Sequence, residues 1–388
     1  MNNWKLIKFL DVLEEPVRNG IYKSKEFHGI GTKIVNMGEL FSNGRLYDID
    51  MRRIYLTDKE KDKYILKNGD LIFARRSLTA DGAGKCSLIY KITEDVVFES
   101  SIIRARPNLN KVDSLFLFYF FNSPYGKYLI GTILRQVAVA GITGSDLMRL
   151  EFLLPPLPEQ KAIAGVLGSL DDKIDLLQRQ NTTLEAMAET LFRQWFIEEA
   201  QEDWGEQAFG NIVTFHDSKR IPLSKTEREK MQSGLLYPYY GAAQIVGYVN
   251  NFIFNGDYLL FAEDGTVRTD SGTPVLQRAY GKFWVNNHTH VITANYPYNN
   301  DFLYIFLLRK NIDELITGAV QPKISQSNLR KLPIPHYPIE LVKKYILLTK
   351  NIFSKIRSNQ QQIRTLEKLR DTLLPKLMSG EVRVRVDG

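Results

Sequence analysis

Residues 159–199 read EQKAIAGVLGSLDDKIDLLQRQNTTLEAMAETLFRQWFIEE, a stretch with no proline and with Gly165 and Gly168 as its interior glycines. Apolar residues recur along it at alternating spacings of four and three, which is the a/d pattern of a heptad repeat. This seam consists of Ile163, Leu167, Leu170, Ile174, Leu177, Asn181, Leu184, Ala188, Leu191 and Trp195. Prolines at positions 155, 156 and 158 are expected to stop any helix from starting earlier. About 40 helical residues span roughly 60 Å, so we expect the seam to need a partner helix.

The same chain supplies a candidate partner, a second helical stretch from Pro338 to about Met378. KIDLLQRQNTTLEAMAETL (173–191) and KIRSNQQQIRTLEKLRDTL (355–373) share KI, TLE and TL at a constant offset of 182 residues. Residues 159–199 carry 4 Lys+Arg against 8 Asp+Glu, a net charge of −4, whereas residues 338–378 carry 9 against 3, a net charge of +6. Opposite charges favour docking of one helix on the other, although each exposed pair contributes little.

Asn181 falls on the first seam, and Asn359 lies on or near the second. Each asparagine is either a simple polar interruption of an apolar stripe or a device that fixes the register of the helix pair at some cost in stability. The sequence leaves both interpretations open.

The composition is that of an ordinary soluble protein, with 388 residues, 44% hydrophobic and 24% charged. No apolar run approaches a membrane span, since LFLFYFF (115–121) is far too short, and the N-terminal MNNWKLIKFLDVLEE has acids where a signal peptide needs an apolar core. The lone Cys86 excludes an intrachain disulfide framework and fits a reducing compartment. We therefore expect a cytoplasmic protein of two or three domains.

The net charge of +7 and pI near 9.1 are compatible with a polyanionic partner, but the charge is unevenly placed. Residues 1–158 carry 23 Lys+Arg and 18 Asp+Glu, whereas residues 200–337 carry 13 of each. Any nucleic-acid face in the second region must therefore be local.

The chain reads as an internal duplication in the order domain, helix, domain, helix. The predicted parts are a first domain (1–157), a central helix (158–199), a second domain (200–337) and a C-terminal helix (338–380). GDLIFA (69–74) resembles GDYLLFA (256–262), and GITGSDLMRL (141–150) resembles PKISQSNLRKL (322–332). Within the first domain a helix is expected over 114–130, with Asp113 as its N-cap. The predicted fold is α+β, with two similar mixed α/β domains separated by two long antiparallel helices that form a coiled coil.

Antiparallel packing of the helices predicts two domains at opposite ends of a rod, related by a pseudo-twofold axis. Such an object suits a long ligand with two separated sites. Duplex DNA is one, because reading heads about one turn of 34–36 Å apart, or a multiple of it, face the same side of the duplex.

The arrangement resembles the specificity (S) subunit of type I restriction–modification systems. The resemblance rests on LLPPLPEQKAIAGVLGSLDDKID (153–175), TLEKLRDTLLPKLMSGEV (365–382), YPYYGAAQIVGYVNNFIFNGDYLLFAEDG (237–265) and TGAVQPKISQSNLRKLPIP (317–335). It covers essentially the whole chain, although the first domain matches only in outline, through GDLIFARRS.

This resemblance implies a non-catalytic subunit whose two target recognition domains each read one half of a split double-stranded DNA sequence. The helices would act as a spacer and as the dock for two adenine methyltransferase subunits, through which restriction–translocation subunits join. S-adenosylmethionine, ATP and Mg would bind those partners, and no cofactor is expected in this chain.

Catalytic patterns are absent from the sequence, so no catalytic or metal residue is expected. No Asn/Asp-Pro-Pro-aromatic tetrapeptide of an amino-methyltransferase occurs. LTADGAGKCSL (78–88) resembles a phosphate loop but has Thr79 and Cys86 where Gly and Ser/Thr belong. Glu263, Asp264 and Asp270 fit a turn better than a metal nuclease. His288 and His290 share one strand face, and without a third ligand nearby they fit packing or DNA contact better than zinc.

DNA contacts need long donors on loops, with Arg or Lys for phosphates and guanine and Asn or Gln for adenine. The DNA-binding candidates are Lys33, Arg75, Arg76 and Lys85 in the first domain and Lys219, Arg220, Gln244, Arg268 and Lys323 in the second. Each is alternatively a solvated surface charge, and Tyr239 and Tyr240 fit packing better than base stacking. The rival functions are a DNA-binding protein that works without methyltransferase partners and an enzyme with an unrecognised site.

Overall fold

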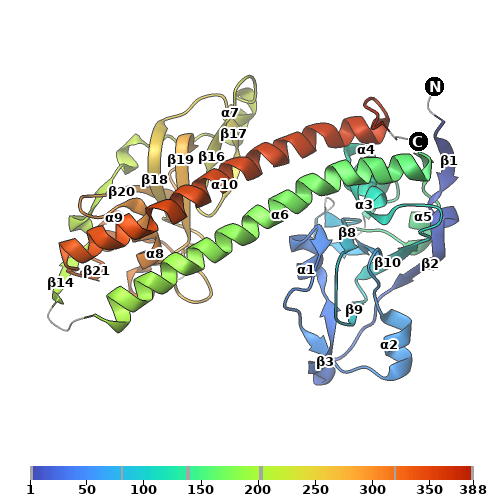
Figure 1. The fold of residues 1–388 in the computed structure, drawn as a ribbon, viewed down its shortest axis with the longest axis horizontal. Coiled ribbons are helices and arrows are strands. Elements are labelled where there is room, and N and C mark those ends of the chain that lie inside the picture. Colours follow the sequence, from blue (N-terminus) through green and yellow to red (C-terminus); the bar gives the residue numbers. More distant parts are fainter. Residues whose placement is uncertain (1–2, 80–81, 137–139, 201–203, 319, 386–388) are drawn as a thin grey trace. The chain divides into compact units, whose positions relative to one another are not determined.

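The computed structural model of the chain describes residues 3–79, 82–136, 140–200, 204–318 and 320–385. The chain divides into two compact units (Figure 1). The first unit comprises Met1–Leu177 with Gln362–Gly388, and the second comprises Gln178–Gln361. Each unit therefore holds one globular domain and one part of each long helix. Among the described residues, no helix is long and apolar enough to cross a membrane.

The globular domain of the first unit is built on a five-stranded sheet with the order β2-β10-β6-β8-β4. Its strands are antiparallel neighbours except for β4, which is parallel to β8. The strands of this unit are β1 (Lys5–Lys8), β2 (Leu13–Asn19), β3 (His28–Val35), β4 (Arg45–Leu46), β5 (Arg53–Ile54), β6 (Leu71–Ala74), β7 (Arg76–Ser77), β8 (Cys86–Ile89), β9 (Val96–Phe98), β10 (Ile102–Pro107), β11 (Arg135–Gln136), β12 (Ala140–Gly141) and β13 (Glu151–Leu154). The short helices are α1 (Met37–Ser42), α2 (Asp58–Tyr64), α3 (Ser114–Asn122), α4 (Pro124–Thr132) and α5 (Gly144–Met148).

The second unit contains a six-stranded sheet with the order β15-β20-β18-β19-β16-β17. Its strands are β14 (Glu206–Ala208), β15 (Val213–Phe215), β16 (Tyr237–Tyr240), β17 (Ile245–Val249), β18 (Phe254–Ala262), β19 (Leu276–Val285), β20 (Thr289–Ala294) and β21 (Pro333–Pro335). The short helices are α7 (Lys225–Lys230), α8 (Asn300–Leu307) and α9 (Gln326–Arg330).

The two sheets follow one plan, which confirms the predicted duplication. The series β2-β10-β6-β8-β4 corresponds to β15-β20-β18-β19-β16, with antiparallel pairs throughout and one parallel pair at the end of each series. In both units the first strand pairs with the last one before the long helix, β1 with β13 and β14 with β21. The amide of Phe9 donates to the carbonyl oxygen of Leu150, and that of Phe209 to Leu332, both at 2.8 Å.

The helix expected over 114–130 is two helices, because Pro124 lacks the amide hydrogen that would continue α3. Asp113 caps α3 as predicted, since its carboxylate accepts a hydrogen bond from the amide of Phe116 at 2.8 Å. Ser123 ends α3 and caps α4. The cap, but not the length of the helix, was readable from the sequence.

The two long helices are α6 (Leu157–Arg193), followed by a π-helical turn at Gln194–Glu198, and α10 (Ile339–Ser379). They run antiparallel, because partners on α10 and its C-terminal extension descend in number as α6 ascends. The contacts are Glu159–Arg383 and Asp171–Arg370 in the first unit, and Asn181–Asn359 and Ala188–Tyr345 in the second. α6 begins at Leu157, one residue before the predicted bound of 158. Pro158 therefore does not stop the helix from starting before it, because the first helical turn needs no amide donor.

All ten predicted seam residues are buried or half-buried. They pack not only on the partner helix but also on the globular domains. In the first unit Ile163 and Leu167 join the core of the globular domain together with Leu377 of α10. In the second unit Ala188 lies in a core with Tyr345 of α10 and Phe302 of α8. The expectation that the seam needs a partner helix because no domain can bury it was therefore too narrow, since each domain packs directly on its part of α6.

The acidic residues of α6 form ion pairs mainly with arginines of the globular domains. The net charges of the two helices do not show this pairing. In the first unit, buried Arg45 on β4 donates to Asp172 at 2.7 Å and to Asp175 at 2.5 Å. In the second unit, buried Arg278 on β19 pairs with Glu185. Between the two helices, the described residues form one ion pair, Arg370 with Asp171 at 2.8 Å.

Asn359 and Asn181 meet within the second unit. The Nδ2 group of Asn359 donates to Oδ1 of Asn181 at 2.9 Å and to Oε1 of Gln180 at 3.3 Å. Asn359 is fully buried, and its own Oδ1 accepts no hydrogen bond from the described residues. An unsatisfied buried oxygen costs stability, which favours the register-fixing interpretation over a simple interruption.

Candidate nucleic-acid interface

The two domains build the same three-segment edge at the end of the central strand of each sheet. In the first unit, Arg76 of β7 pairs with Gly141 of β12, and Gly141 pairs with Arg135 of β11. In the second unit, isolated bridges join Asp264 to Lys323 and Lys323 to Thr317. The offsets are 188 residues for the first segment and 182 for the other two, so each bridge has its counterpart in the other unit.

Backbone hydrogen bonds fix this edge identically in both units. The amide of Arg75 donates to Ser101 at 2.8 Å, and the amide of Glu263 donates to His288 at 2.9 Å. The carbonyl oxygens of Arg75 and Glu263 accept from Ile142 at 3.0 Å and Ile324 at 2.8 Å. The scaffold is thus constant while its side chains differ, with two arginines at 75–76 and two carboxylates at 263–264.

In the first unit Arg76 is the most accessible candidate donor. It is exposed and pairs with no carboxylate among the described residues. Arg75 is half-buried, and its Nη1 donates to the carbonyl oxygen of Ser100 at 3.4 Å. Lys85 is also half-buried, and its ammonium donates to the carbonyl oxygen of Phe41 at 2.6 Å.

Lys33 lies apart from this edge, on β3. Its side chain is 9% exposed, and its ammonium pairs with Glu94 at 2.9 Å and Asp48 at 4.0 Å. These contacts leave it little reach toward a ligand.

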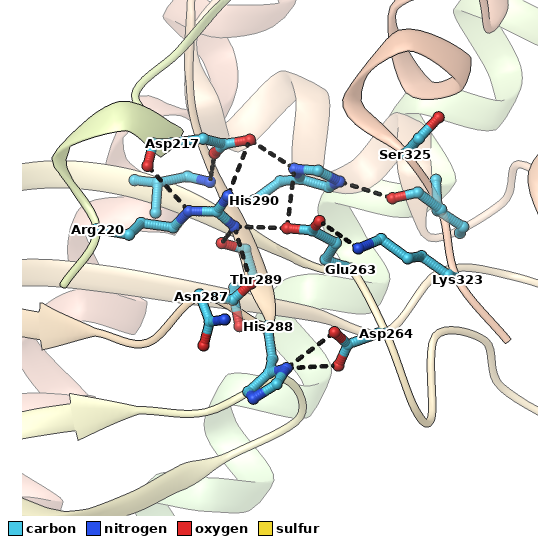
Figure 2. A network of polar contacts seen from close by, with 12 residues as sticks. Asp217, Arg220, Glu263, Asp264, Asn287, His288, Thr289, His290, Lys323 and Ser325 are labelled. Atoms are coloured by element: carbon cyan, nitrogen blue, oxygen red, sulfur yellow. Dashed lines mark hydrogen bonds and ion pairs between the residues drawn. The ribbon is translucent and has the colours of Figure 1, made fainter. Parts of the chain in front are cut away.

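In the second unit the edge is held by a network of charged groups (Figure 2). Arg220 donates through Nη1 to Oε2 of Glu263 at 2.6 Å and to the carbonyl oxygen of Thr289 at 2.7 Å. Lys323 reaches Oε1 of Glu263 at 3.2 Å. Buried His290 has Nδ1 2.6 Å from Oδ2 of Asp217.

His290 makes a polar contact through each of its ring nitrogens. Nε2 lies 2.8 Å from the carbonyl oxygen of Ile324, while Nδ1 lies 2.6 Å from Oδ2 of Asp217. His290 thus ties the segment that carries Lys323 to the sheet.

The two carboxylates of the network stay ionised. Burial raises the pKa of Asp217. The hydrogen bond from His290, the amide of Val291 and the charge of Arg220 together lower this pKa by more, so that the net shift is downward. The pKa of Glu263 is lowered in the same way, since burial is outweighed by Arg220, His290 and Lys323. The two carboxylates are thus surrounded by the cations of Arg220 and Lys323 and by the ring of His290.

Asp217, Glu263 and His290 also place three potential metal-ligand atoms within 4.8 Å of one another. A third ligand was not expected near the histidines, because Asp217 precedes them by about 70 residues in the sequence. Arg220 and Lys323 already occupy both oxygens of Glu263, so the cluster needs no metal ion to balance its charge.

His288 and His290 do not share a strand face as predicted. β20 begins at Thr289, so His288 precedes the strand, and Figure 2 shows it turned toward Asp264. Its Nδ1 lies 2.8 Å from the Asp264 carboxylate. The alternation rule fails here because it holds only inside a strand.

The other candidates of the second unit lie in separate places. Lys219 follows β15, Gln244 precedes β17, and both are exposed. Arg268 is half exposed and paired with Asp313 at 2.5 Å. Tyr239 and Tyr240 are buried, which confirms packing for both.

The stretch that resembles a phosphate loop does not have the structure of one. Ala80 and Asp81 lie outside the described residues, and residues 86–89 form strand β8, whereas a phosphate loop leads into a helix. Burial raises the pKa of the Cys86 thiol, which keeps it protonated.

Comparison with known proteins agrees with this duplicated architecture. A putative type I restriction enzyme MjaX specificity subunit of Methanocaldococcus jannaschii is 25% identical over 99% of this chain and 94% of its own length. The type I restriction enzyme MjaIX specificity subunit of the same organism is 27% identical over 70% of each chain. A crystal structure of a type I restriction–modification S subunit from M. genitalium has a TM-score of 0.57 at 19% identity, covering 97% of this chain and 96% of that one, which shows a shared fold.

The family model of the type I restriction modification DNA specificity domain matches residues 1–186 and 201–368. These two matches together cover most of the chain and fall one on each half of the duplication. The chain therefore belongs to the type I restriction–modification DNA specificity domain family.

Proposed function

We propose that this chain is the non-catalytic DNA-recognition subunit of a type I restriction–modification complex, in which each globular domain reads one half of a bipartite target. The observation that carries this proposal is the three-segment edge, built twice on one backbone scaffold with different side chains. Two copies of a reading head with different chemistry suit two half-sites with different sequences.

The division into a first recognition domain (1–157), a central spacer helix (158–199), a second recognition domain (200–337) and a C-terminal spacer helix (338–380) belongs to this proposal. The helices set the distance between half-sites and dock two methyltransferase subunits, and restriction–translocation subunits join through those. S-adenosylmethionine, ATP and Mg act on these partners, and the complex works in the cytoplasm.

The chemistry of each edge suggests what it reads. Arg76 offers a guanidinium, which binds guanine or phosphate oxygens. The second edge offers Lys323 as a donor and the Asp264–His288 pair as an acceptor, and a carboxylate can accept from the amino group of cytosine. The other proposed DNA contacts are Lys33, Arg75, Lys85, Lys219, Arg220, Gln244 and Arg268. Arg220 would contribute indirectly, because it holds the carboxylate of Glu263.

The test is a map of methylated adenines in a host that expresses the complete complex, for the wild type and for a chain with Arg75→Ala and Arg76→Ala. We expect a bipartite wild-type motif, with recognition of one half impaired in the variant and the other half unchanged. The control is Lys59→Ala with Lys67→Ala, which removes two exposed charges from the same domain. Unchanged methylation by the arginine variant would refute the assignment of these residues.

The rival functions have their own outcomes. Nuclease or methyltransferase activity of the isolated chain with Mg or S-adenosylmethionine would contradict the non-catalytic role. Purification of the native chain without a larger subunit would favour a DNA-binding protein that works alone.

A further inference from the structure

Beside the three-segment edge of the first unit lies a pocket of about 470 Å³. Its walls come from the segment 83–86 and from α3 and α4 of the same unit. The polar lining is Lys85, Asn122 and Lys127, and the apolar lining includes Phe121, Ile130 and Leu134. This pocket is not predictable from sequence spacing, because Lys127 lies 42 positions after Lys85 and on a helix.

The charged groups that line the pocket are two ammonium groups, those of Lys85 and Lys127. Neither Lys85 nor Lys127 forms an ion pair with a carboxylate of the described residues. Burial, and after it the charge of Lys127, lowers the pKa of Lys85. The two ammonium groups repel each other across the pocket. An anion that enters the pocket would stabilise both positive charges.

The pocket adjoins the edge through the backbone. The amide of Ala74, the last residue of β6, donates to the carbonyl oxygen of Lys85 at 2.9 Å, and Arg75 and Arg76 follow directly. Gly84 holds the segment against α4, because a Cβ there would lie 2.2 Å from Cγ2 of Ile130, and its φ of +77° favours glycine. A ligand that touches Arg76 can therefore extend to the pocket along this segment.

Among the described residues of the second unit, the corresponding position carries no lysine. There the amide of Ala262 donates to Val275, so a valine occupies the position of Lys85. The pocket beside that edge is lined by Arg268 and Asp313, which neutralise each other at 2.5 Å. Among the described residues, two lysines therefore line a pocket beside the edge of the first domain but not beside that of the second, in line with the excess of Lys and Arg in residues 1–158.

We propose that the Lys85–Lys127 pocket binds one phosphate of the DNA strand that flanks the half-site read by the first domain. This inference rests on the proposed function and adds to it an anchoring contact that carries no sequence information. Phosphate contacts fix the position of a protein on the duplex, while base contacts select the sequence. The anion is a backbone phosphate because the pocket adjoins Arg76, the exposed candidate for base contact.

The experiment measures the affinity of the methyltransferase–specificity complex for a duplex with its mapped target as a function of salt. Each phosphate contact contributes about 0.9 to the slope of log K against log salt. Lys127→Ala should reduce the magnitude of the slope by about 0.9 and leave the ratio of specific to non-specific affinity unchanged. Lys85→Val, which copies the second domain, should do the same.

The double variant tests whether the two lysines share one phosphate. A shared phosphate predicts a loss of about 0.9 for the double variant also, whereas two separate phosphates predict about 1.8 and would overturn the shared site. Lys127→Arg should restore the slope, and Lys59→Ala on α2 should not change it. Figure 1 shows α2 and α4 at different ends of this domain, which makes Lys59 a matched remote lysine.

Ethylation of individual DNA phosphates identifies the contact directly. One phosphate beside the first half-site should block binding of the wild type when ethylated and have no further effect on Lys127→Ala. An unchanged slope in Lys127→Ala, or a relaxed sequence preference, overturns the inference. Tight binding of inorganic phosphate without any effect of Lys127→Ala on DNA overturns it as well. Failure of the wild-type complex to select any sequence would instead refute the proposed function.

Discussion

The attachment of the second domain to α6 gives the sharpest stability prediction. Arg278 on β19 has a side chain 4% exposed and pairs with Glu185 of α6, with Asp301 as a more distant partner at 3.7 Å. Its guanidinium also lies 4.2 Å from the ring centroid of Tyr304. Glu185→Ala leaves this buried cation without its nearest carboxylate.

Removal of one partner of a buried ion pair costs about 3–5 kcal/mol. The Glu185 side chain is 31% exposed, so solvent screens part of the interaction and about 2 kcal/mol is expected. Glu189→Ala is the matched control, one helical turn further along α6. Glu189 is 41% exposed and pairs with Arg309, itself 35% exposed, so its loss should cost under about 1 kcal/mol.

Hydrogen–deuterium exchange of the intact chain measures this cost locally. A loss of 2 kcal/mol corresponds to about thirtyfold faster exchange of the protected amides in α6 from residue 178 onward and in β19. The control should change the same amides only a few-fold. Equal acceleration by both variants would refute the argument, because burial of Arg278 would then play no part.

Three further predictions concern the helix pair and the ion network of the second unit. Asn359→Leu leaves Oδ1 of Asn181 without its 2.9 Å donor and should lower the free energy of unfolding by about 1–3 kcal/mol. The double variant Asn181→Leu with Asn359→Leu should melt at or above the wild-type temperature. A double variant that is less stable than the single one would contradict the register-fixing role. Asp217 has a folded pKa below its unfolded value, so its contribution to stability is full above the unfolded pKa and is lost as pH falls through the folded pKa. The melting temperature of Asp217→Asn should therefore depend less on pH below about 5 than that of the wild type, with exposed Asp270→Asn as a control that retains the wild-type dependence. A chelator should leave the melting temperature unchanged, and destabilisation by EDTA would show that the Asp217–Glu263–His290 cluster holds a metal ion.

Periodicity and repetition carried the fold prediction because both are local or nearly local properties of the sequence. Spacings of three and four place the residues from Ile163 to Trp195 on one helix face, and a constant offset of 182 aligns Leu150 with Leu332. The net charges of the helices did not predict the ion-pair partners, because net charge does not say which cation reaches Asp175 or Glu185.

The site was only partly predictable for the same reason. Arg75 and Arg76 were found because they follow an apolar strand and enter a loop, where long donors can reach DNA. Asp217 escaped because its link to His290 joins positions 73 apart, and only the sheet brings them together. Lys33 lies in a glycine-rich stretch that reads as a ligand-binding turn, yet in the folded chain its ammonium pairs with Glu94 and Asp48.

The role of the helix pair is tested most directly by lengthening both helices where the two units meet in sequence. Seven residues inserted after Leu177 and seven after Gln361 preserve the heptad seam and add roughly 10 Å of helix, about three base-pair steps. Mapping of methylated adenines should then return the same two half-sites with a longer gap. An unchanged gap, or altered half-sites, would contradict the account of two reading heads held apart by a helical spacer.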